Sequence, residues 1–319
     1  MKKFRKTGPM SLRRLVGNLH IQRRILPTLA VAAGLLTASN AVGTEINLVT
    51  GTTINGVAAT TSGSFTTGTV GGPAIYELID TQPAGTGVFL PFLSYQHKTT
   101  EQGVNTSSGG NGQGFLDDKR VPQWTHDLHL GELGTITRNG VSYYAFELDA
   151  NETGVGQPNR LLSIDNIRII TSVASPFASA NNDGDVLAAV NGALPTGTAN
   201  HLVYAQNTIP VSTDNYVLID ASRRTEGSTS GSGSSDMLVL VPTALFPNQA
   251  ANKDLFVTFY TLNGAHDAAG DDGSDAGFEE WRALTSPTAV PDGGSTLLLL
   301  GSALIPLGLL RARRESSKA

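Results

Sequence analysis

The chain of 319 residues contains no cysteine. Disulfide bridges, thiolate metal sites and cysteine nucleophiles are therefore excluded. If such a chain is exported, its fold must depend on its hydrophobic core, on bound ions, or on both.

Charged residues are scarce, at 15% of the chain, and aromatic residues make up 6%. With 39% hydrophobic residues and 36 glycines, the composition is typical of a globular, loop-rich protein. Residues 1–41 hold eight basic side chains and no acid, whereas residues 42–310 hold ten basic and 26 acidic ones, a formal charge of −16. A region of that sign attracts cations and repels nucleic acid; solubility alone is the alternative interpretation.

Apolar runs are short, whereas a membrane helix needs about 20 residues. The run over residues 25–36 follows basic residues that end at Arg24. Small residues come next and predict cleavage after Ala41, with Ser39 at the minus-three position. This order is typical of a secretory signal peptide over residues 1–41, and an uncleaved anchor is the alternative.

A second short run, Thr296 to Leu310, lies near the C-terminus between a Pro-Asp-Gly-Gly motif and an arginine cluster. This tripartite pattern resembles a PEP-CTERM sorting signal in its VPDSG-like variant, with Gly293 where that variant commonly has serine. The resemblance implies recognition by an exosortase, a membrane protease-transpeptidase that removes the tail; an anchor that stays uncut is the alternative. The residues that carry the motif are Val290, Pro291, Asp292, Gly293, Gly294, Ser295, Arg311, Arg313 and Arg314.

The region between the two ends consists of short β-branched and aromatic runs separated by Gly, Asn, Asp, Ser and Pro. This spacing predicts an all-β fold, an antiparallel β-sandwich of Ig-like or jelly-roll-like type, flanked by the signal helix and a short C-terminal hydrophobic helix. The expected strands are Gly87–Tyr95, Thr125–Leu130, Val141–Leu148, Leu161–Thr171, Asp185–Val190, Leu202–Gln206, Tyr216–Asp220, Met237–Val241 and Leu255–Leu262.

Two local features refine this prediction. Asn139-Gly140 is a favoured two-residue hairpin turn, which would pair residues 133–137 with 141–146. The apolar alternation in residues 161–170 breaks at Asp165-Asn166, which indicates a β-bulge.

We expect the chain to be organised as one β module between two trafficking signals. A break near residues 172–184 leaves open a division of the module into two subdomains. The expected parts are a signal peptide (1–41), the module (42–284), a stalk (285–289), a sorting signal with a short transmembrane helix (290–314) and a tail (315–319).

Several phrases within residues 86–281 resemble those of a group of exported bacterial PEP-CTERM proteins. This resemblance supports a single exported module and implies no mechanism, because the group has no established activity. Among the phrases are Glu101–Thr106, Trp124–Leu128, Phe146–Glu152, Leu161–Asp165, Gly231–Met237 and Gly277–Trp281.

Carboxylates at strand ends are the best candidates for chemistry. Asp149, Asn151 and Glu152 follow one expected strand directly, and Asp165 would join them if its strand is a neighbour. Hard cations such as calcium take six to eight oxygens of this kind. These four residues are therefore candidate calcium ligands, with ordinary Asx turns as the alternative.

A second acidic group is interpreted as a solvated loop rather than a defined site, because it does not fit the helix-loop-helix calcium pattern. Its members are Asp267, Asp271, Asp272, Asp275, Glu279 and Glu280.

The sequence contains no H-E-x-x-H motif, no phosphate-binding loop and no G-x-S-x-G nucleophile motif. We therefore expect a non-enzymatic structural or adhesive protein of the cell surface or extracellular matrix. Its expected partners are signal peptidase, the exosortase and, before processing, the inner membrane. A carbohydrate-binding module for exopolysaccharide is the alternative, with a stacking platform of Trp124, Trp281, Tyr95, Tyr143 and Tyr144. A hydrolase that pairs Glu147 with Glu101 is a weaker third hypothesis.

Overall fold

The computed structural model describes residues 44–81, 90–108, 114–119, 121–152, 161–195, 200–208, 215–221, 235–266, 272–275 and 277–285. The chain divides into two units, Met1–Asn40 and Ala41–Ala319, and all described residues belong to the second. The expected signal peptide, its cleavage position Ala41 and the sorting motif from Val290 to Arg314 lie outside the described residues.

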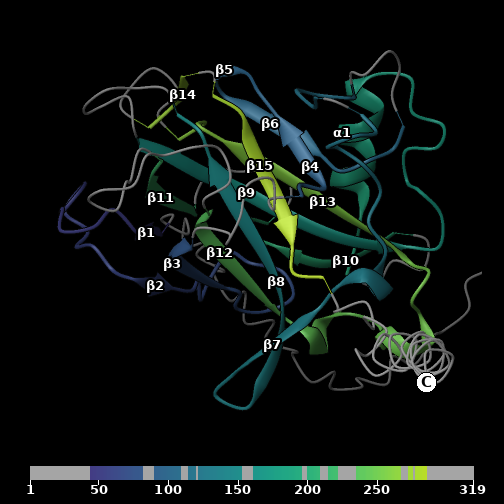
Figure 1. Ribbon diagram of the computed structural model, residues 1–319, viewed down its shortest axis with the longest axis horizontal. Coiled ribbons are helices and arrows are strands. Elements are labelled where there is room, and N and C mark those ends of the chain that lie inside the picture. Colours follow the sequence, from purple (N-terminus) through teal and green to yellow (C-terminus); the bar gives the residue numbers. More distant parts are fainter. Residues whose placement is uncertain are drawn as a thin grey trace, which may run out of the picture. The chain divides into compact units, whose positions relative to one another are not determined.

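The first sheet, called sheet 1, is built around the long strand β9 (Figure 1). Its strand order is β1-β11-β9-β13-β6, and β10 pairs with β9 as well. All pairs are antiparallel except β1 with β11, which is parallel. The strands are β1 (Glu45–Asn47), β6 (Glu101–Val104), β9 (Leu161–Ser172), β10 (Asn200–Ala205), β11 (Tyr216–Asp220) and β13 (Phe256–Asn263).

The second sheet, called sheet 2, is wholly antiparallel and has the order β2-β3-β12-β8-β15-β4, with β7 paired to β8. Its strands are β2 (Ser62–Gly63), β3 (Ile75–Thr81), β4 (Leu93–Tyr95), β7 (Thr135–Arg138), β8 (Val141–Ala150), β12 (Ser235–Pro242) and β15 (Glu279–Ala283). A separate small pair joins β5 (Lys98–Thr99) to β14 (Ser274–Asp275).

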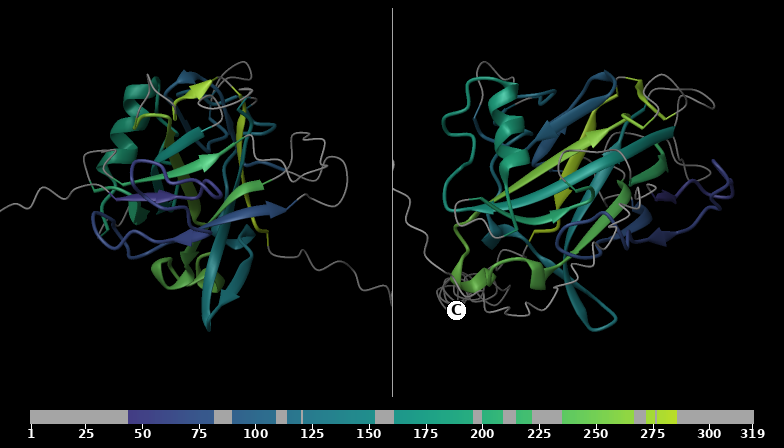
Figure 2. Two further views of the ribbon diagram at one scale, coloured as in Figure 1. Left: turned by 90° about the vertical axis from the view of Figure 1, so that its left-hand side faces the viewer. Right: turned by 180° about the vertical axis from the view of Figure 1, so that it is seen from behind.

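The main hydrophobic core lies between the inner faces of the two sheets, whose layered arrangement is seen in Figure 2. Sheet 1 contributes Ile164, Ile167 and Phe259 to it, and sheet 2 contributes Phe146 and Trp281. Each of these side chains is fully buried. Inward residues alternate with outward ones along each strand because successive side chains point to opposite faces.

The predicted all-β fold is confirmed by these two mainly antiparallel sheets. The hairpin is also confirmed: β7 pairs with β8 in register Arg138↔Val141, and Asn139 and Gly140 have φ values of +50° and +81°. Positive φ at both turn positions is what a type I′ turn requires. The segment 172–184, where a division into two subdomains was left open, lies between β9 and β10 in the sequence. These two strands pair with one another in sheet 1.

The predicted bulge in β9 is confirmed as well. Along β13, Leu262 is opposite Asn166 and the next residue, Asn263, is opposite Ile164, so Asp165 is the extra residue. Both Ile164 and Ile167 therefore reach the core although they are three positions apart.

Two predicted strands are wrong. Residues 185–190 belong to an α-helix, α1 (Asp183–Gly192), which starts where the Asn182 side chain accepts a hydrogen bond from the Asp185 backbone N–H. Val186 and Val190 are buried four residues apart, which is a helical spacing. Residues 125–130, the second wrong prediction, form no strand. The described residues also contain short 3₁₀ helices, η1 (Leu130–Glu132), η2 (Thr243–Leu245) and η3 (Gln249–Ala251).

Candidate metal centre

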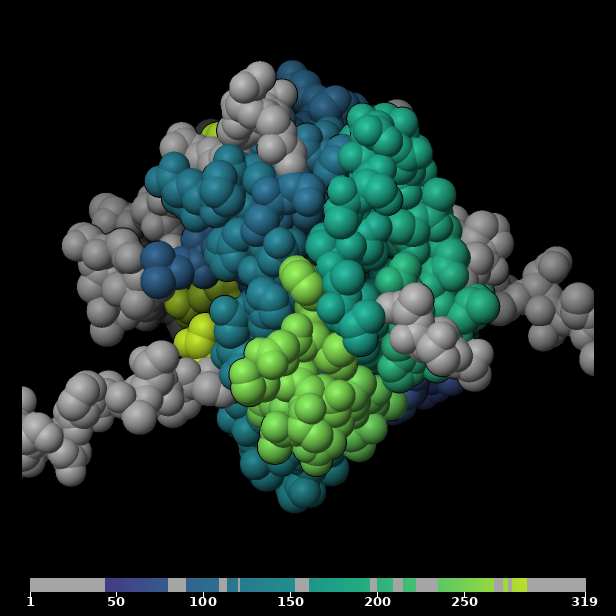
Figure 3. Space-filling view, turned by 90° about the vertical axis from the view of Figure 1, so that its right-hand side faces the viewer, coloured from purple at the N-terminus to yellow at the C-terminus, as the bar shows by residue number. Residues whose placement is uncertain are grey.

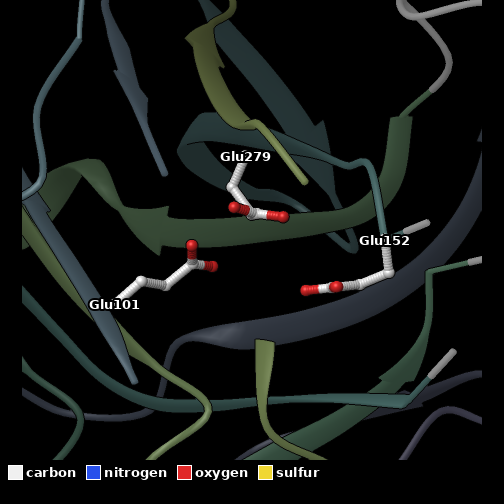
Figure 4. A group of neighbouring side chains, drawn as sticks. All are labelled: Glu101, Glu152 and Glu279. Carbon is white, nitrogen blue, oxygen red and sulfur yellow. The ribbon is translucent and has the colours of Figure 1, made fainter. Parts of the chain in front are cut away.

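Three buried glutamates converge between the two sheets (Figure 4). Glu101 is the first residue of β6 in sheet 1, Glu279 is the first residue of β15 in sheet 2, and Glu152 lies two residues after the end of β8. One carboxylate oxygen from each lies within 4.8 Å of the others. Glu101 and Glu279 have no exposed surface, and Glu152 is 9% exposed. We call these three residues the glutamate triad.

The alternation of each strand explains why two of these glutamates point inward. Glu279 shares a face of β15 with Trp281, which is fully buried in the main core. Glu101 shares a face of β6 with Gly103, where an added Cβ would lie 2.8 Å from a ring carbon of Tyr95. A glycine at that position lets the Tyr95 ring pack directly against β6 beside Glu101.

A close backbone contact brings the third glutamate to the other two. A Cβ added to Gly277 would lie 1.5 Å from the backbone oxygen of Asn151, so only glycine fits there. The Asn151 side-chain amide donates a hydrogen bond of 2.8 Å to the backbone oxygen of Phe278. The segments before Glu279 and Glu152 are therefore tied together, and the two side chains enter the same space.

Hydrogen-bond donors surround the Glu101 carboxylate. The backbone N–H of His97 donates to its Oε2 at 3.3 Å, and Nδ2 of Asn263 donates to its Oε1 at 3.5 Å. The Asn263 amide also donates to the Tyr95 hydroxyl at 2.5 Å, as does the indole N–H of Trp281 at 3.0 Å. Neutral donors therefore line the triad on the side of sheet 1 and the core.

Burial raises the pKa of Glu101 to about 8. Hydrogen bonds with Glu279, His97 and Asn263 lower this pKa, while the charge of Glu152 raises it. Burial also raises the pKa of the Tyr95 hydroxyl well above its usual value, and the charges of Glu101 and Glu279 add to that effect. At neutral pH the triad must therefore either hold a proton or neutralise its charge with a cation.

The dimensions of the triad suit a hard cation. Two oxygens on opposite sides of a calcium ion, each at about 2.4 Å, are about 4.8 Å apart. Three carboxylates are the ligand type that calcium prefers, and zinc prefers nitrogen or sulfur. Among the described residues this is the one group of three or more potential ligands that converge closely enough.

The four candidate calcium ligands do not form one site. Glu152 belongs to the triad, whereas Asp149 lies on the outer face of sheet 2, opposite Glu280 in the pairing of β8 with β15. The side-chain amide of Asn151 donates a hydrogen bond to the backbone oxygen of Phe278. Asp165 lies on the other sheet, in the bulge of β9.

Asp165 has its own set of donors on the outer face of sheet 1. Its Oδ2 accepts hydrogen bonds from the Ser163 hydroxyl at 3.0 Å and from the backbone N–H of Ala265 at 2.7 Å. Burial raises the pKa of this carboxyl to about 6, although both hydrogen bonds lower it. The prediction that Asp165 joins Asp149 depended on β8 and β9 being neighbours, but the two strands belong to different sheets.

The acidic segment near the C-terminal end of the module was interpreted as solvated, and for Glu279 this interpretation is wrong. Glu279 has no exposed surface, and Asp272 is 6% exposed and lies 2.9 Å from Nδ1 of His266. Asp267 and Asp271 lie outside the described residues. The alternation with Trp281 was the signal that would have placed Glu279 in the core.

The residues of the two alternative functions are not arranged as those functions require. Four aromatics of the predicted sugar platform are buried in the fold: Tyr95, Tyr143, Tyr144 and Trp281. Glu147 lies on the outer face of sheet 2, where it accepts hydrogen bonds from Ser235 at 2.6 Å and from Arg282 Nε at 2.8 Å. Glu101 points inward, so these two carboxylates do not face one another.

Comparison with protein-family models, with curated proteins and with solved structures finds no match to this chain. Within the described part of the chain, no helix has the length and apolar character needed to cross a membrane. The two apolar segments at the chain ends lie outside that part.

Proposed function

We propose that this chain is an exported, exosortase-processed protein of the cell surface or extracellular matrix, with a non-enzymatic structural or adhesive role. Its central module is an antiparallel β-sandwich of Ig-like or jelly-roll-like type that calcium stabilises at the glutamate triad. Signal peptidase acts at Ala41, the inner membrane holds the intermediate, and the exosortase acts at the Pro291-Asp292 motif. The convergence of three buried carboxylates between the sheets carries the proposal for the module.

A cation at the triad would connect the two sheets. Glu101 comes from β6 in sheet 1, whereas Glu152 and Glu279 come from segments of sheet 2. A single bound ion therefore fastens the two layers to one another, the role that a disulfide between sheets has in many exported β-sandwiches. A chain without cysteine has no such bridge, and a hard cation supplies an equivalent link.

The burial of the triad supports a structural rather than a catalytic ion. Burying three carboxylates in a low-dielectric core is costly unless their charge is neutralised. A calcium ion that takes one or two oxygens from each carboxylate removes most of that cost and needs only a few further oxygen ligands. Because the ion binds the folded state, it raises the free energy of unfolding.

Calcium binding is tested by the thermal unfolding of the full chain in calcium and in chelator. At a calcium concentration 100-fold above Kd we expect a stabilisation of about 2.7 kcal/mol, or about 5–10 °C in Tm. Glu279→Gln should abolish the shift. Glu280→Gln is the matched control, because its side chain lies on the opposite face of β15, and it should retain the shift. An equal Tm in calcium and chelator for the unmodified chain would remove calcium from the proposal.

The trafficking part has a separate test. Cells expressing the full chain are fractionated beside cells expressing a chain that lacks residues 290–319. The full chain should reach the cell surface or the medium with its tail removed, and the shortened chain should bypass tail processing. Recovery of the full-length, unprocessed polypeptide from the cytosol would refute the export proposal without affecting the calcium test.

A further inference from the structure

Asparagine followed by glycine occurs in the chain at Asn55, Asn111, Asn139, Asn191 and Asn263. An asparagine in this context is chemically reactive, because glycine has no side chain to shield its backbone nitrogen from the asparagine carboxamide. Asn111 lies outside the described residues, and the structure describes the other pairs. How firmly the fold holds each of their carboxamides decides which of them can react.

The fold holds the carboxamides of Asn263 and Asn191 firmly. Asn263 has no exposed surface; its Nδ2 donates a hydrogen bond of 2.5 Å to the Tyr95 hydroxyl, and its Oδ1 accepts one of 2.9 Å from Oγ1 of Thr261. Asn191 lies in the last turn of α1, where its Oδ1 accepts a hydrogen bond of 2.9 Å from Nη1 of Arg168. Rotation of either carboxamide toward the next backbone nitrogen would break these bonds.

Asn55 is held more weakly, at the tip of a short turn. The backbone groups of Ile54 and Val57 exchange hydrogen bonds of 3.1 and 2.7 Å across this turn, and Asn55 and Gly56 have φ values of +51° and +81°. The Asn55 side chain is exposed, but its Nδ2 still donates to the Tyr216 hydroxyl at 3.5 Å. This long hydrogen bond is the restraint that the described residues place on the carboxamide.

Asn139 lies in a turn of the same kind without such a restraint. It is exposed at the tip of the β7–β8 hairpin, and its carboxamide makes no hydrogen bond with any of the described residues. The hairpin extends past the neighbouring strands at the lower end of the sandwich in Figure 1, and it forms the lowest part of the surface in Figure 3. Val141, at the start of β8, is 44% exposed, so the tip of the hairpin is not packed into a core.

The backbone N–H of Gly140 is available as well. The register Arg138↔Val141 closes the hairpin over two residues, so the hydrogen bonds of the turn join Arg138 and Val141. Among the described residues, no backbone hydrogen bond starts from the Gly140 N–H. Both Asn139 and Gly140 are exposed. The nitrogen that attacks and the carboxamide that is attacked are therefore both accessible to water and free to approach each other.

We propose that Asn139 is a site of spontaneous deamidation. The backbone nitrogen of Gly140 gives its proton to hydroxide and attacks Cγ of Asn139, and the new N–Cγ bond closes a cyclic succinimide. The Cγ–Nδ2 bond breaks, and the amide nitrogen leaves as ammonia after taking a proton from water. A second water molecule then opens the ring: cleavage of the Cγ–N bond gives aspartate, and cleavage of the bond between the nitrogen and the backbone carbonyl carbon gives isoaspartate.

The two products affect the hairpin differently. Aspartate before glycine also suits a type I′ turn, so the aspartate product keeps β7 paired with β8 and adds a negative charge beside Arg138. Isoaspartate adds a main-chain atom to a turn that closes over two residues, so it weakens the pairing of Arg138 with Val141. It also loosens Ile136, which packs with Tyr143 on the outer face of sheet 2. The hairpin tip is at the opposite end of β8 from Glu152, so the reaction does not depend on the proposed calcium role.

The test is peptide mapping of the full chain after incubation in mildly alkaline buffer, with the folded chain compared to the chain in guanidinium chloride. Mass spectrometry should show conversion of amide to acid in the peptide that contains Asn139, and chromatography should separate an aspartate and an isoaspartate form. Asn139 should convert in the folded chain about as fast as in the unfolded chain. Asn263 should convert at least about tenfold more slowly in the folded chain than in the unfolded chain, because only unfolding releases its carboxamide.

Asn139→Gly is the matched variant, since glycine also suits this turn position and has no carboxamide. It should remove both products at this position and leave the slower conversion of Asn55 unchanged. An amide that persists at Asn139 in the folded chain, while the unfolded chain converts it, would overturn the proposal. Faster conversion of Asn55 than of Asn139, or aspartate without any isoaspartate, would also overturn it.

Discussion

The protonation of Glu101 predicts how stability depends on pH when no calcium is present. Its pKa is about 8 in the folded protein against an ordinary value of 4.5. Between these values the folded state holds a proton that the unfolded state has released. The unfolding free energy must therefore fall as pH rises through this window. One proton gives a slope of about 1.4 kcal/mol per pH unit, or about 3–4 kcal/mol between pH 5 and pH 8.

Calcium should change this behaviour, because it binds the deprotonated carboxylates. Its stabilising effect should be small near pH 5 and largest near pH 8, where it replaces the lost proton. In Glu101→Gln, the proton-binding group is gone, so the slope measured in chelator should flatten by about one proton. The amide keeps the shape of the side chain and its acceptor oxygen.

The measurement is urea unfolding in chelator at several pH values, followed by tryptophan emission, to which the fully buried Trp281 contributes. Asp165→Asn serves as the control, because the raised pKa of Asp165 gives a slope of the same sign at lower pH, around its folded value of about 6. Subtracting the slope of Glu101→Gln from that of the unmodified chain isolates Glu101. Equal slopes for these two proteins between pH 6 and pH 8 would refute the argument that Glu101 holds the proton.

Three further substitutions test the packing that forms the site and the fold. Gly277→Ala places a methyl group 1.5 Å from the Asn151 oxygen. It should lower the free energy of unfolding by about 3 kcal/mol and abolish the rise in Tm with calcium; an unchanged Tm would contradict the close contact. Trp281→Ala removes the largest fully buried side chain and should cost about 3–5 kcal/mol in urea unfolding, so a loss below about 1 kcal/mol would contradict its place in the core. Asn182→Ala deletes the cap of α1 and should cost about 1 kcal/mol, whereas Asn181→Ala, which leaves that cap bond intact, should cost less.

The parts of the fold that follow from local chemistry were predictable from the sequence. Turn residues and alternating apolar residues mark most strands, and Asn139-Gly140 determines its hairpin through backbone conformation alone. The bulge was visible because an inward residue at 164 and another at 167 cannot share one face of a regular strand. Each of these signals lies within a few residues of sequence.

Helix α1 was missed because a short apolar run is compatible with either a strand or a helix. The deciding feature was Asn182, whose side chain caps the first turn through the Asp185 backbone. Together with the burial of Val186 and Val190, this cap indicates a helix. The secondary-structure propensities of residues 185–190 alone did not distinguish a helix from a strand.

The glutamate triad could be predicted only in part from the sequence. Glu152 was a candidate because it follows a strand, but Glu101 and Glu279 are far apart in sequence and meet only when β6 and β15 are packed in opposite layers. Local clustering pointed instead to Asp149 and Asp165, which lie on different sheets and outside the core between them. Contacts between layers depend on topology, which short-range patterns do not contain.

The position of β15 within its sheet affects the timing of folding. This strand is the last of the described residues, yet it lies between β8 and β4. Until the ribosome has made Trp281, β4 lacks its neighbour, the interior lacks its largest side chain, and the third carboxylate is missing. The polypeptide therefore remains without its native architecture until β15 has been made.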